Sequence, residues 1–345
     1  MSGADGRPDL TDALDALDTF LLDEPPSLTR VEVAEQAGVP LEVAHELWRL
    51  LGFPTQTDEA VAFTPADVQA LRYSHDLMEL GILSADRQAA LVRTWGRSFA
   101  RLAEWQTGLL TSVALESGSD PAETLAQMTQ EVLPRVDALQ SYVWRRHLVS
   151  AANRMLAVES PGSEVTDLAV VFVDIVGYTS RSKTLSESEL VEWLEYFEGE
   201  TLGLVVDRGS RIIKNIGDEV LLVADDVTAA ADVALEMTRR GQDDDDRFPG
   251  VRAGIAYGPV VNRLGDVFGP TVNVAARLTS VARPGTVVVD HGAYEALSGR
   301  SGDDEDADSE SGADETAYSL RRIRRVSVKG YSRLQAWALR GPANE

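Results

Sequence analysis

The chain has 345 residues, enough for two domains that each bury a core, and its 56 acidic and 32 basic residues give a formal net charge of -24. This charge repels phosphate backbones and anionic lipid, so nucleic acid is not an expected partner. Cysteine is absent, the start lacks the features of a signal peptide, and no apolar run approaches the about 20 residues that span a bilayer, so we expect a cytoplasmic protein without disulfides or a membrane span.

Residues 1–158 are predicted to form an all-helical domain. Apolar residues recur at helical spacing from Leu10 to about Leu156, as in Leu14, Leu17 and Leu21, and no clear strand alternation interrupts them. A connector helix over residues 148–156 is expected at the end of this domain. The turn-forming residues 160–163 come directly after the predicted boundary.

Residues 159–345 change to short β-branched runs between helical segments, which predicts an α+β domain. We expect helices over residues 186–207, 227–240 and 271–282, and strands over 168–174, 210–214, 219–224, 251–257, 286–290, about 317–328 and 334–339. Two acidic tracts, 243–246 and 303–315, interrupt this domain. The second is too polar to bury anything, so we predict that it is a disordered loop.

Two aspartates lie where predicted strands end. Asp174 follows an apolar strand and precedes a turn at Gly177, whose backbone N–H groups could face an anion. Asp218 lies at the tip of a predicted hairpin between Lys214 and Leu221. Carboxylates at adjacent strand ends are typical of sites that hold Mg²⁺ or Mn²⁺ together with substrate phosphates, and two such ions suit a displacement at phosphorus. Alternatively, Asp174 caps the turn and Asp218 stabilises the hairpin.

Arginine supplies nearly all of the positive charge, since Lys183, Lys214 and Lys329 are the three lysines of the chain. Lys214 and Lys329 each lie in a segment that reads as a strand running into a glycine turn. Arginine replaces lysine freely on a solvated surface, but it is too large and forked where one small donor must meet a ligand. Both lysines are therefore candidate ligand-binding residues, and the alternative is chance retention of three codons.

With these motifs, residues 166–340 resemble the class III nucleotidyl cyclases. The resemblance implies their catalytic fold, a ferredoxin-like or palm-type sheet with covering helices. It also implies that Asp174 and Asp218, together with Ile175, hold two Mg²⁺ or Mn²⁺ ions. The substrate-binding residues that it implies are Lys214, Asp266, Lys329, Arg252, Ile175, Gly177, Tyr178 and Thr179.

The resemblance assigns the catalytic and base-reading roles as well. Asn273 matches the asparagine that orients the ribose, and Arg277 matches the arginine that stabilises the transition state; four residues apart on a helix, they share one face. Lys214 is implied to donate to the adenine ring, and Asp266 to accept from its amino group. Guanine reverses this polarity, and because each buried mismatch costs about 1–3 kcal/mol, ATP is favoured over GTP.

The implied activity is that of an adenylate cyclase, which converts ATP to 3′,5′-cyclic AMP and pyrophosphate by two-metal-assisted attack of the ribose 3′-oxygen. Lys214 and Asp218 lie on one short hairpin, yet their implied tasks are at opposite ends of ATP. In the family, two catalytic domains meet head to tail and share each site, so we expect a homodimer with two sites at the interface. The hairpin lacks the Gly-Gly-Asp/Glu-Glu-Phe motif of diguanylate cyclases, which disfavours that activity.

The first domain resembles the helical N-terminal halves of soluble actinobacterial cyclases, which implies control of activity through the connector helix. His147 beside Arg145 and Arg146 suggests a proton input, and the alternative is an ordinary surface histidine. A small apolar effector is another possible input, in a pocket lined by Trp95, Phe99, Trp105, Leu109 and Leu110, although these residues equally suit a plain helical core.

One alternative interpretation starts from residues 28–49, which read like a helix-turn-helix. The chain would then be a nucleotide-sensing regulator with a DNA-binding N-terminal domain and an inactive cyclase half. The charge of the second helix opposes this hypothesis, because it has Glu42 and Glu46 against the single basic residue Arg49.

Overall fold

The structure is a computed structural model, and it describes residues 20–22, 24–81, 84–157, 165–299, 318–323, 326–328 and 331–341. The chain divides into two compact units, Met1–Pro161 and Gly162–Glu345. The predicted loop at 303–315 and the turn at 160–163 lie outside the described residues. None of the described helices is both long enough and apolar enough to cross a membrane.

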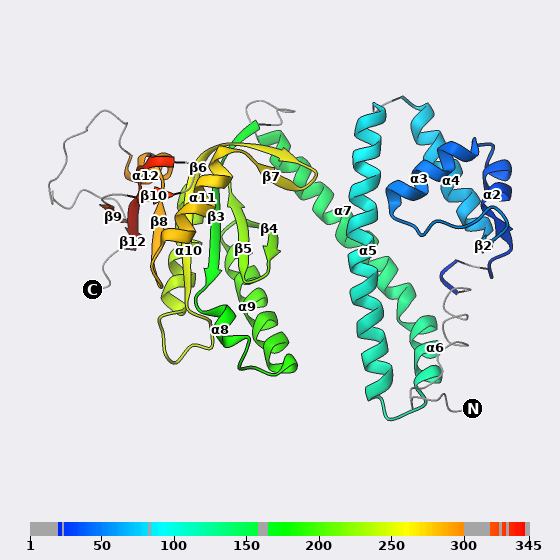
Figure 1. Cartoon of the computed structure of the whole chain (residues 1–345), viewed down its shortest axis with the longest axis horizontal. Helices are drawn as coiled ribbons and strands as arrows, with labels where there is room; N and C mark the ends of the chain where they lie inside the picture. The colour runs from blue at the N-terminus through cyan, green and yellow to red at the C-terminus, as the bar shows by residue number, and fades with distance from the viewer. Residues whose placement is uncertain are drawn as a thin grey trace. The chain divides into compact units, whose positions relative to one another are not determined.

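Helices dominate the described part of the first unit (Figure 1): α2 (Arg30–Ala37), α3 (Leu41–Leu51), α4 (Pro65–Glu79), α5 (Ala85–Glu116), α6 (Pro121–Glu131) and α7 (Leu133–Ala157). Thr29 begins α2 with a capping box to Glu32, and Gly38 ends it in the left-handed conformation. Val33, Trp48 and Leu71 join α2, α3 and α4 in one buried core.

The first unit is not entirely helical, which departs from the prediction. β1 (Leu28–Thr29) pairs antiparallel with β2 (Val61–Phe63) beside this core. Strands of two and three residues are too short to show an alternating pattern, so periodicity alone could not reveal them.

Helix α7 contains the segment predicted to be a connector. It runs to Ala157, and the first strand of the second unit begins at Val165. From Trp144 onward it exposes several large apolar side chains, among them Trp144, Leu148 and Leu156.

The second unit is built on one large sheet. Its strands, with a separate small pair, are β3 (Val165–Ile175), β4 (Arg211–Ile216), β5 (Glu219–Ala224), β6 (Val251–Arg263), β7 (Asp266–Phe268), β8 (Val287–Val289), β9 (Ser319–Arg322), β10 (Val326–Val328), β11 (Tyr331–Leu334) and β12 (Trp337–Arg340). The main sheet has the order β4-β5-β3-β6-β8-β12-β9, with β7 paired to β6, while β10 and β11 pair separately. The central strand β3 pairs antiparallel with both β5 and β6.

Helices cover both faces of this sheet (Figure 1): α8 (Tyr178–Arg181), α9 (Glu187–Asp207), α10 (Val227–Arg240), α11 (Pro270–Val281) and α12 (His291–Ser298). Val171 and Val173 of β3 face the core of α9, α10 and α12, whereas Val170 and Phe172 face α11. Burial on both faces explains why β3 reads as one continuous apolar run. The predicted α+β class is confirmed, although α12 and β7 were not predicted.

Candidate functional site

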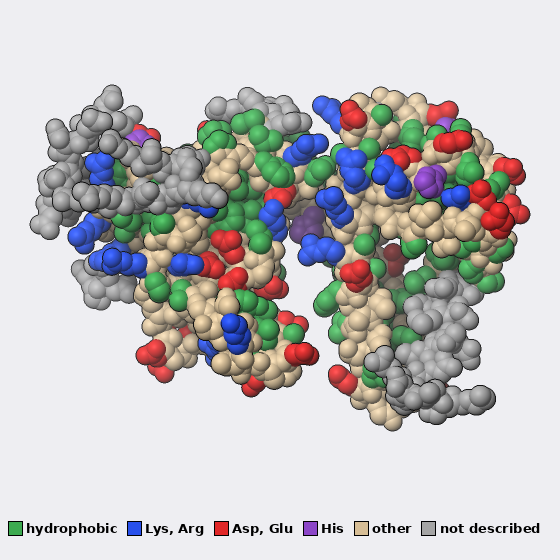
Figure 2. All heavy atoms as spheres, viewed as in Figure 1, with side chains coloured by type: hydrophobic (Ala, Val, Ile, Leu, Met, Phe, Trp, Pro, Cys, Tyr) green, Lys and Arg blue, Asp and Glu red, His purple; other side chains and the backbone are tan. Residues whose placement is uncertain are grey.

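The two predicted metal-binding aspartates lie at neighbouring strand ends. Asp174 is close to the end of β3, and its side chain is 17% exposed. Asp218 lies in the turn between β4 and β5, where its carbonyl oxygen accepts a 3.2 Å hydrogen bond from the N–H of Ile175. The hairpin tip therefore lies directly beside the end of β3. Acidic side chains gather on this part of the second unit, over β3, β4 and β5 (Figure 2).

A third carboxylate belongs to this corner, and the sequence analysis missed it. Glu219 begins β5 and is the cross-strand partner of Asp174. Burial raises the pKa of Glu219 to about 7, and repulsion first from Asp174 and then from Asp218 adds to the effect. Its position directly after Asp218, at the first place of a predicted strand, was the available signal.

Arg252 of β6 lies opposite Asp174 on the other side of β3. Its Nε donates to Oδ2 of Asp174 at 2.7 Å, and a second guanidinium nitrogen approaches the same oxygen at 2.5 Å. The predicted phosphate-binding arginine thus neutralises a predicted metal ligand here. This pairing offsets part of the repulsion among the three carboxylates.

The donor set of this corner suits a divalent cation. Two aspartates and nearby backbone carbonyls offer the hard oxygen ligands of Mg²⁺, which usually takes one or two protein carboxylates and completes its shell with water and substrate phosphates. Within the described ranges, no cluster of three or more acidic or histidine side chains forms a complete metal cage. The residues therefore fit an ion that shares its ligands with a substrate. Such an ion would also offset the repulsion of Asp174 and Asp218, which adds to burial in raising the pKa of Glu219.

The turn after β3 is ordered by glycine. Gly177 has φ +72° and precedes the short helix α8, and the N–H of Val176 donates to the carbonyl of Gly250 at 2.8 Å. The predicted substrate-binding residues of this turn, Tyr178 and Thr179, begin α8. Tyr178 is partly buried, and Thr179 is exposed.

The two predicted base-reading residues contact each other directly. Lys214 of β4 donates from Nζ to Oδ2 of Asp266, which begins β7, and the other Asp266 oxygen accepts from the N–H of Val267 at 2.9 Å. The side chains are 41% and 28% exposed. The ammonium and the carboxylate thus converge from strands 52 residues apart in sequence.

Asn273 and Arg277 are exposed on α11, and their spacing puts them on one face of that helix. The helix lies very close to the sheet, because Gly254 of β6 has no side chain: a Cβ there would lie 2.5 Å from the carbonyl oxygen of Ala275. Thr279 also donates to the carbonyl of Phe172 in β3 at 3.2 Å. Lys329 lies outside the described residues.

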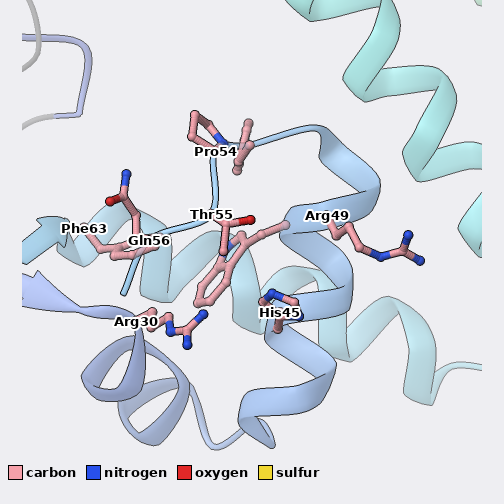
Figure 3. A pocket seen from close by; sticks show the side chains of 9 residues that line it. Arg30, His45, Arg49, Pro54, Thr55, Gln56 and Phe63 are labelled. Carbon is pink, nitrogen blue, oxygen red and sulfur yellow. The ribbon is translucent and has the colours of Figure 1, made fainter. Parts of the chain in front are cut away.

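In the first unit, the predicted effector-binding residues do not form a pocket. Trp95, Phe99, Trp105 and Leu109 are all exposed on α5, whereas Leu110 packs against the buried Ala114 and Leu125, so the five residues do not line one enclosed cavity. A narrow pocket lies elsewhere, between α3 and the segment before β2, and Arg30, His45 and Gln56 help to line it (Figure 3). Its enclosed space is about 20 Å³, roughly the room of one water molecule.

The face of α3 that a DNA-binding protein would use has little positive charge. Glu42, His45, Glu46 and Arg49 are its exposed polar residues. Arg49 donates to both carboxylate oxygens of Glu46 at 2.8 and 2.7 Å, so its charge is paired. Nothing on this face compensates the phosphate repulsion that the net charge of the chain implies.

A family model described as the adenylate and guanylate cyclase catalytic domain matches residues 161–341. The chain belongs to this family. It is 40% identical over 275 residues to the adenylate cyclase of Streptomyces coelicolor, which covers 78% of this chain and 71% of that protein. The adenylate cyclase of Streptomyces griseus is 36% identical over 320 residues, covering 91% of this chain and 79% of that protein.

A third relative of the cyclase family comes from Mycobacterium tuberculosis and is named a pH-sensitive adenylate cyclase. It is 32% identical over 281 residues, which is 77% of this chain and 69% of that protein. The family match coincides with the second unit, so the predicted class III cyclase fold of that unit is confirmed.

Proposed function

We propose that this chain makes 3′,5′-cyclic AMP and pyrophosphate from ATP with two divalent ions, in sites shared between two copies and controlled by the first unit. That the chain is an adenylate cyclase follows from its catalytic domain and its similarity to adenylate cyclases over most of its length. The metal mechanism, the shared sites and the control are the proposed parts.

The observation that carries the choice of ATP is the contact between Lys214 and Asp266. An ammonium that donates to adenine N1 and a carboxylate that accepts from the 6-amino group must approach the same base edge. These two groups already meet at one point and remain partly exposed, so adenine can take the place of their mutual contact. Guanine would place a donor against Lys214 and an acceptor against Asp266.

At the other end of the nucleotide, Asp174, Asp218 and the carbonyl of Ile175 would hold the ions, and the turn at Gly177–Thr179 would meet the phosphates. When bound, the ions supply a lowered pKa for the 3′-hydroxyl and neutralise charge on the phosphates. The 3′-oxygen attacks the α-phosphorus in line while the bond to pyrophosphate breaks. Asn273 orients the ribose, Arg277 meets the charge that develops on the α-phosphoryl oxygens, and Arg252 and Lys329 bind the remaining phosphates.

Two copies are inferred from the hairpin of β4 and β5. Lys214 and Asp218 lie only four residues apart on this hairpin, although their proposed tasks are at opposite ends of ATP. A head-to-tail pair of catalytic units would place the base-reading pair of one copy opposite the carboxylates of the other, and symmetry would then make two equivalent sites.

Control by the first unit is proposed to pass through α7. This helix runs without a break to Ala157, shortly before β3. Its exposed apolar side chains could be buried in one regulatory state and exposed in another. A shift of about 1 Å at the shared sites can cost a hundredfold in rate. His147 is exposed on α7 beside two arginines, which makes it the candidate proton input.

The activity is tested with purified full-length protein given ATP or GTP with Mg²⁺ or Mn²⁺, and the products are separated by chromatography. We expect cyclic AMP from ATP and far less cyclic GMP from GTP. Equal use of both nucleotides would contradict the assigned base reading, and absence of product with either metal would contradict the activity.

The control is tested by comparing the full chain with residues 160–345 across pH 5.5–8.5. If protons act through the first unit, the two pH profiles differ in shape, and a full-length His147→Gln variant moves toward the profile of the fragment. Parallel profiles would exclude a proton input through the first unit.

A further inference from the structure

The short helix after the glycine turn is held by one aromatic ring. Trp193 of α9 meets two side chains of α8: the Tyr178 ring stacks on it at a centroid distance of 6.1 Å and an interplanar angle of 14°, and the Arg181 guanidinium carbon lies 4.5 Å from its centroid. Tyr178 and Arg181 are three apart, so they occupy one face of this helical turn. Both ends of α8 are therefore attached to the same ring.

Trp193 is itself firmly fixed. It is 8% exposed and belongs to the core that also contains Phe197 and Val205 of the same helix. Its Nε1 is buried and has no hydrogen-bond partner among the described residues. A smaller ring without this N–H would lose no hydrogen bond, so the face of the indole is what the neighbouring residues use.

The face of the Trp193 indole holds the Arg181 side chain in place. Arg181 is exposed, and within the described ranges no ion pair involves it. In a chain of net charge -24, an arginine held by an aromatic ring keeps its full positive charge, whereas a carboxylate partner would have neutralised it. A helix of four residues has too few internal hydrogen bonds to fix its own direction, so α8 takes its direction from such contacts.

We propose that Trp193 is a positioning residue for nucleotide cyclisation: by holding Tyr178 and Arg181, it sets the orientation of the turn 175–179 toward the phosphates. The proposal rests on the proposed function, because it takes that turn to be the phosphate-binding turn. Trp193 acts through α8 and does not itself touch the nucleotide.

The test compares three full-length variants, each assayed for cyclic AMP formation and for binding of a non-hydrolysable ATP analogue by calorimetry. Trp193→Leu keeps an apolar side chain but removes the ring, and we expect kcat to fall about 10- to 100-fold while the Kd of the analogue changes less than about 3-fold. Trp193→Phe keeps a ring face for both contacts, so kcat should stay within about 3-fold of the wild type. Phe197→Leu is the matched control, since Phe197 lies on the same helix and in the same core, and its ring contacts Phe248 of another segment at a centroid distance of 5.3 Å.

Simple destabilisation gives a different pattern. It would lower kcat and the number of analogue-binding sites together, and Phe197→Leu would then lose as much activity as Trp193→Leu. Either that outcome or an unchanged kcat in Trp193→Leu overturns the proposal. Thermal unfolding of each variant shows the fraction folded at the assay temperature.

A double-mutant cycle tests the route through Arg181 with a substitution at an exposed position. Arg181→Met should lower kcat about 3- to 10-fold in the wild-type background and have little further effect in Trp193→Leu, because coupled residues are not additive. Independent, multiplicative effects would overturn the proposal. If the wild type forms no cyclic AMP at all, the proposed function fails, and the analogue titrations and unfolding curves still show whether Trp193 orders the turn.

Discussion

Glu219 lies beside Asp174 and Asp218, where β3 ends and β5 begins. Its raised pKa links the stability of the fold to pH. The pKa of Glu219 is about 7 in the fold, because burial and then the charges of Asp174 and Asp218 disfavour its ionised form. Between about pH 4.5 and 7, the folded chain therefore binds a proton that the unfolded chain has released. The contribution of this residue to stability thus falls as pH rises through that window.

The substitution Glu219→Gln should remove this loss of stability at rising pH, because glutamine does not ionise. We expect the variant to be about 1–2 kcal/mol more stable than the wild type at pH 8, after allowance for solvent screening, and nearly equal to it at pH 4. Urea unfolding with a chelator present, so that no ion occupies the carboxylates, measures the difference. A gain of the same size at both pH values would show that ionisation of Glu219 is not its cause.

Replacing the Asp266 carboxylate with an amide should weaken the discrimination between adenine and guanine. In Asp266→Asn, the amide can accept or donate, so the clash with guanine weakens while Lys214 loses its charged partner. We expect kcat/KM for ATP to fall about 10- to 100-fold and the ratio of ATP to GTP use to narrow. Parallel assays with the two nucleotides check this, and Asp225→Asn is the control, because Asp225 pairs with Arg211 on the same sheet without contacting Lys214. An unchanged nucleotide ratio in Asp266→Asn would remove Asp266 from base reading.

At the scale of elements, the close approach of α11 to β6 places Asn273 and Arg277. Gly254→Ala forces the two apart, since the new methyl would lie 2.5 Å from the Ala275 carbonyl oxygen. Overpacking of this kind costs about 1–3 kcal/mol, and we expect kcat to fall in parallel as α11 shifts. Gly199→Ala is the matched control: Gly199 lies inside α9 with open space around it, so alanine there should stabilise the protein by about 0.5–1 kcal/mol without changing kcat. Thermal unfolding and cyclic AMP assays test both.

The elements that sequence reasoning recovered are those with a long, regular apolar pattern. α10 begins and ends where it was predicted, and β3 was visible as an apolar run because both of its faces are buried. β1, β2 and β7 are two or three residues long, so pairing with a distant partner decides them and local pattern does not. The eight-residue α12 depends on its Asp290 cap, which the sequence analysis overlooked.

In the candidate site too, local patterns were predictable and contacts between distant strands were not. Strand-end and glycine-turn patterns singled out Asp174, Asp218 and Lys214, whereas Asp266 was named only through the resemblance to the class III cyclases. Neither the contact between Lys214 and Asp266 nor the pairing of Arg252 with Asp174 could be predicted, since each depends on the register of strands far apart in sequence. The pairing of Glu219 with Asp174 also depends on strand register, although its position directly after Asp218 was a local signal that the prediction did not use.

For the whole molecule, shared sites predict complementation. Asp174→Ala and Lys214→Ala should each abolish activity in homodimers, whereas a heterodimer of the two keeps one intact site and about half of the wild-type activity. The matched control puts both substitutions in one chain and pairs it with a wild-type chain, which damages both shared sites. Differently tagged chains, purified as heterodimers and assayed for cyclic AMP, measure the two arrangements. Activity in the control and none in the first heterodimer would mean that each chain holds a complete site of its own.

The Arg252–Asp174 ion pair would couple the binding of the nucleotide to the binding of the cation. In the proposed site, Arg252 binds a phosphate and Asp174 binds a cation. A nucleotide that draws Arg252 away would leave the Asp174 carboxylate without its ion-pair partner and so raise its affinity for the cation. By thermodynamic reciprocity, a cation that occupies Asp174 releases the arginine for the nucleotide. With the roles proposed for Arg252 and Asp174, we expect the chain to bind nucleotide and metal cooperatively, each more tightly when the other is present.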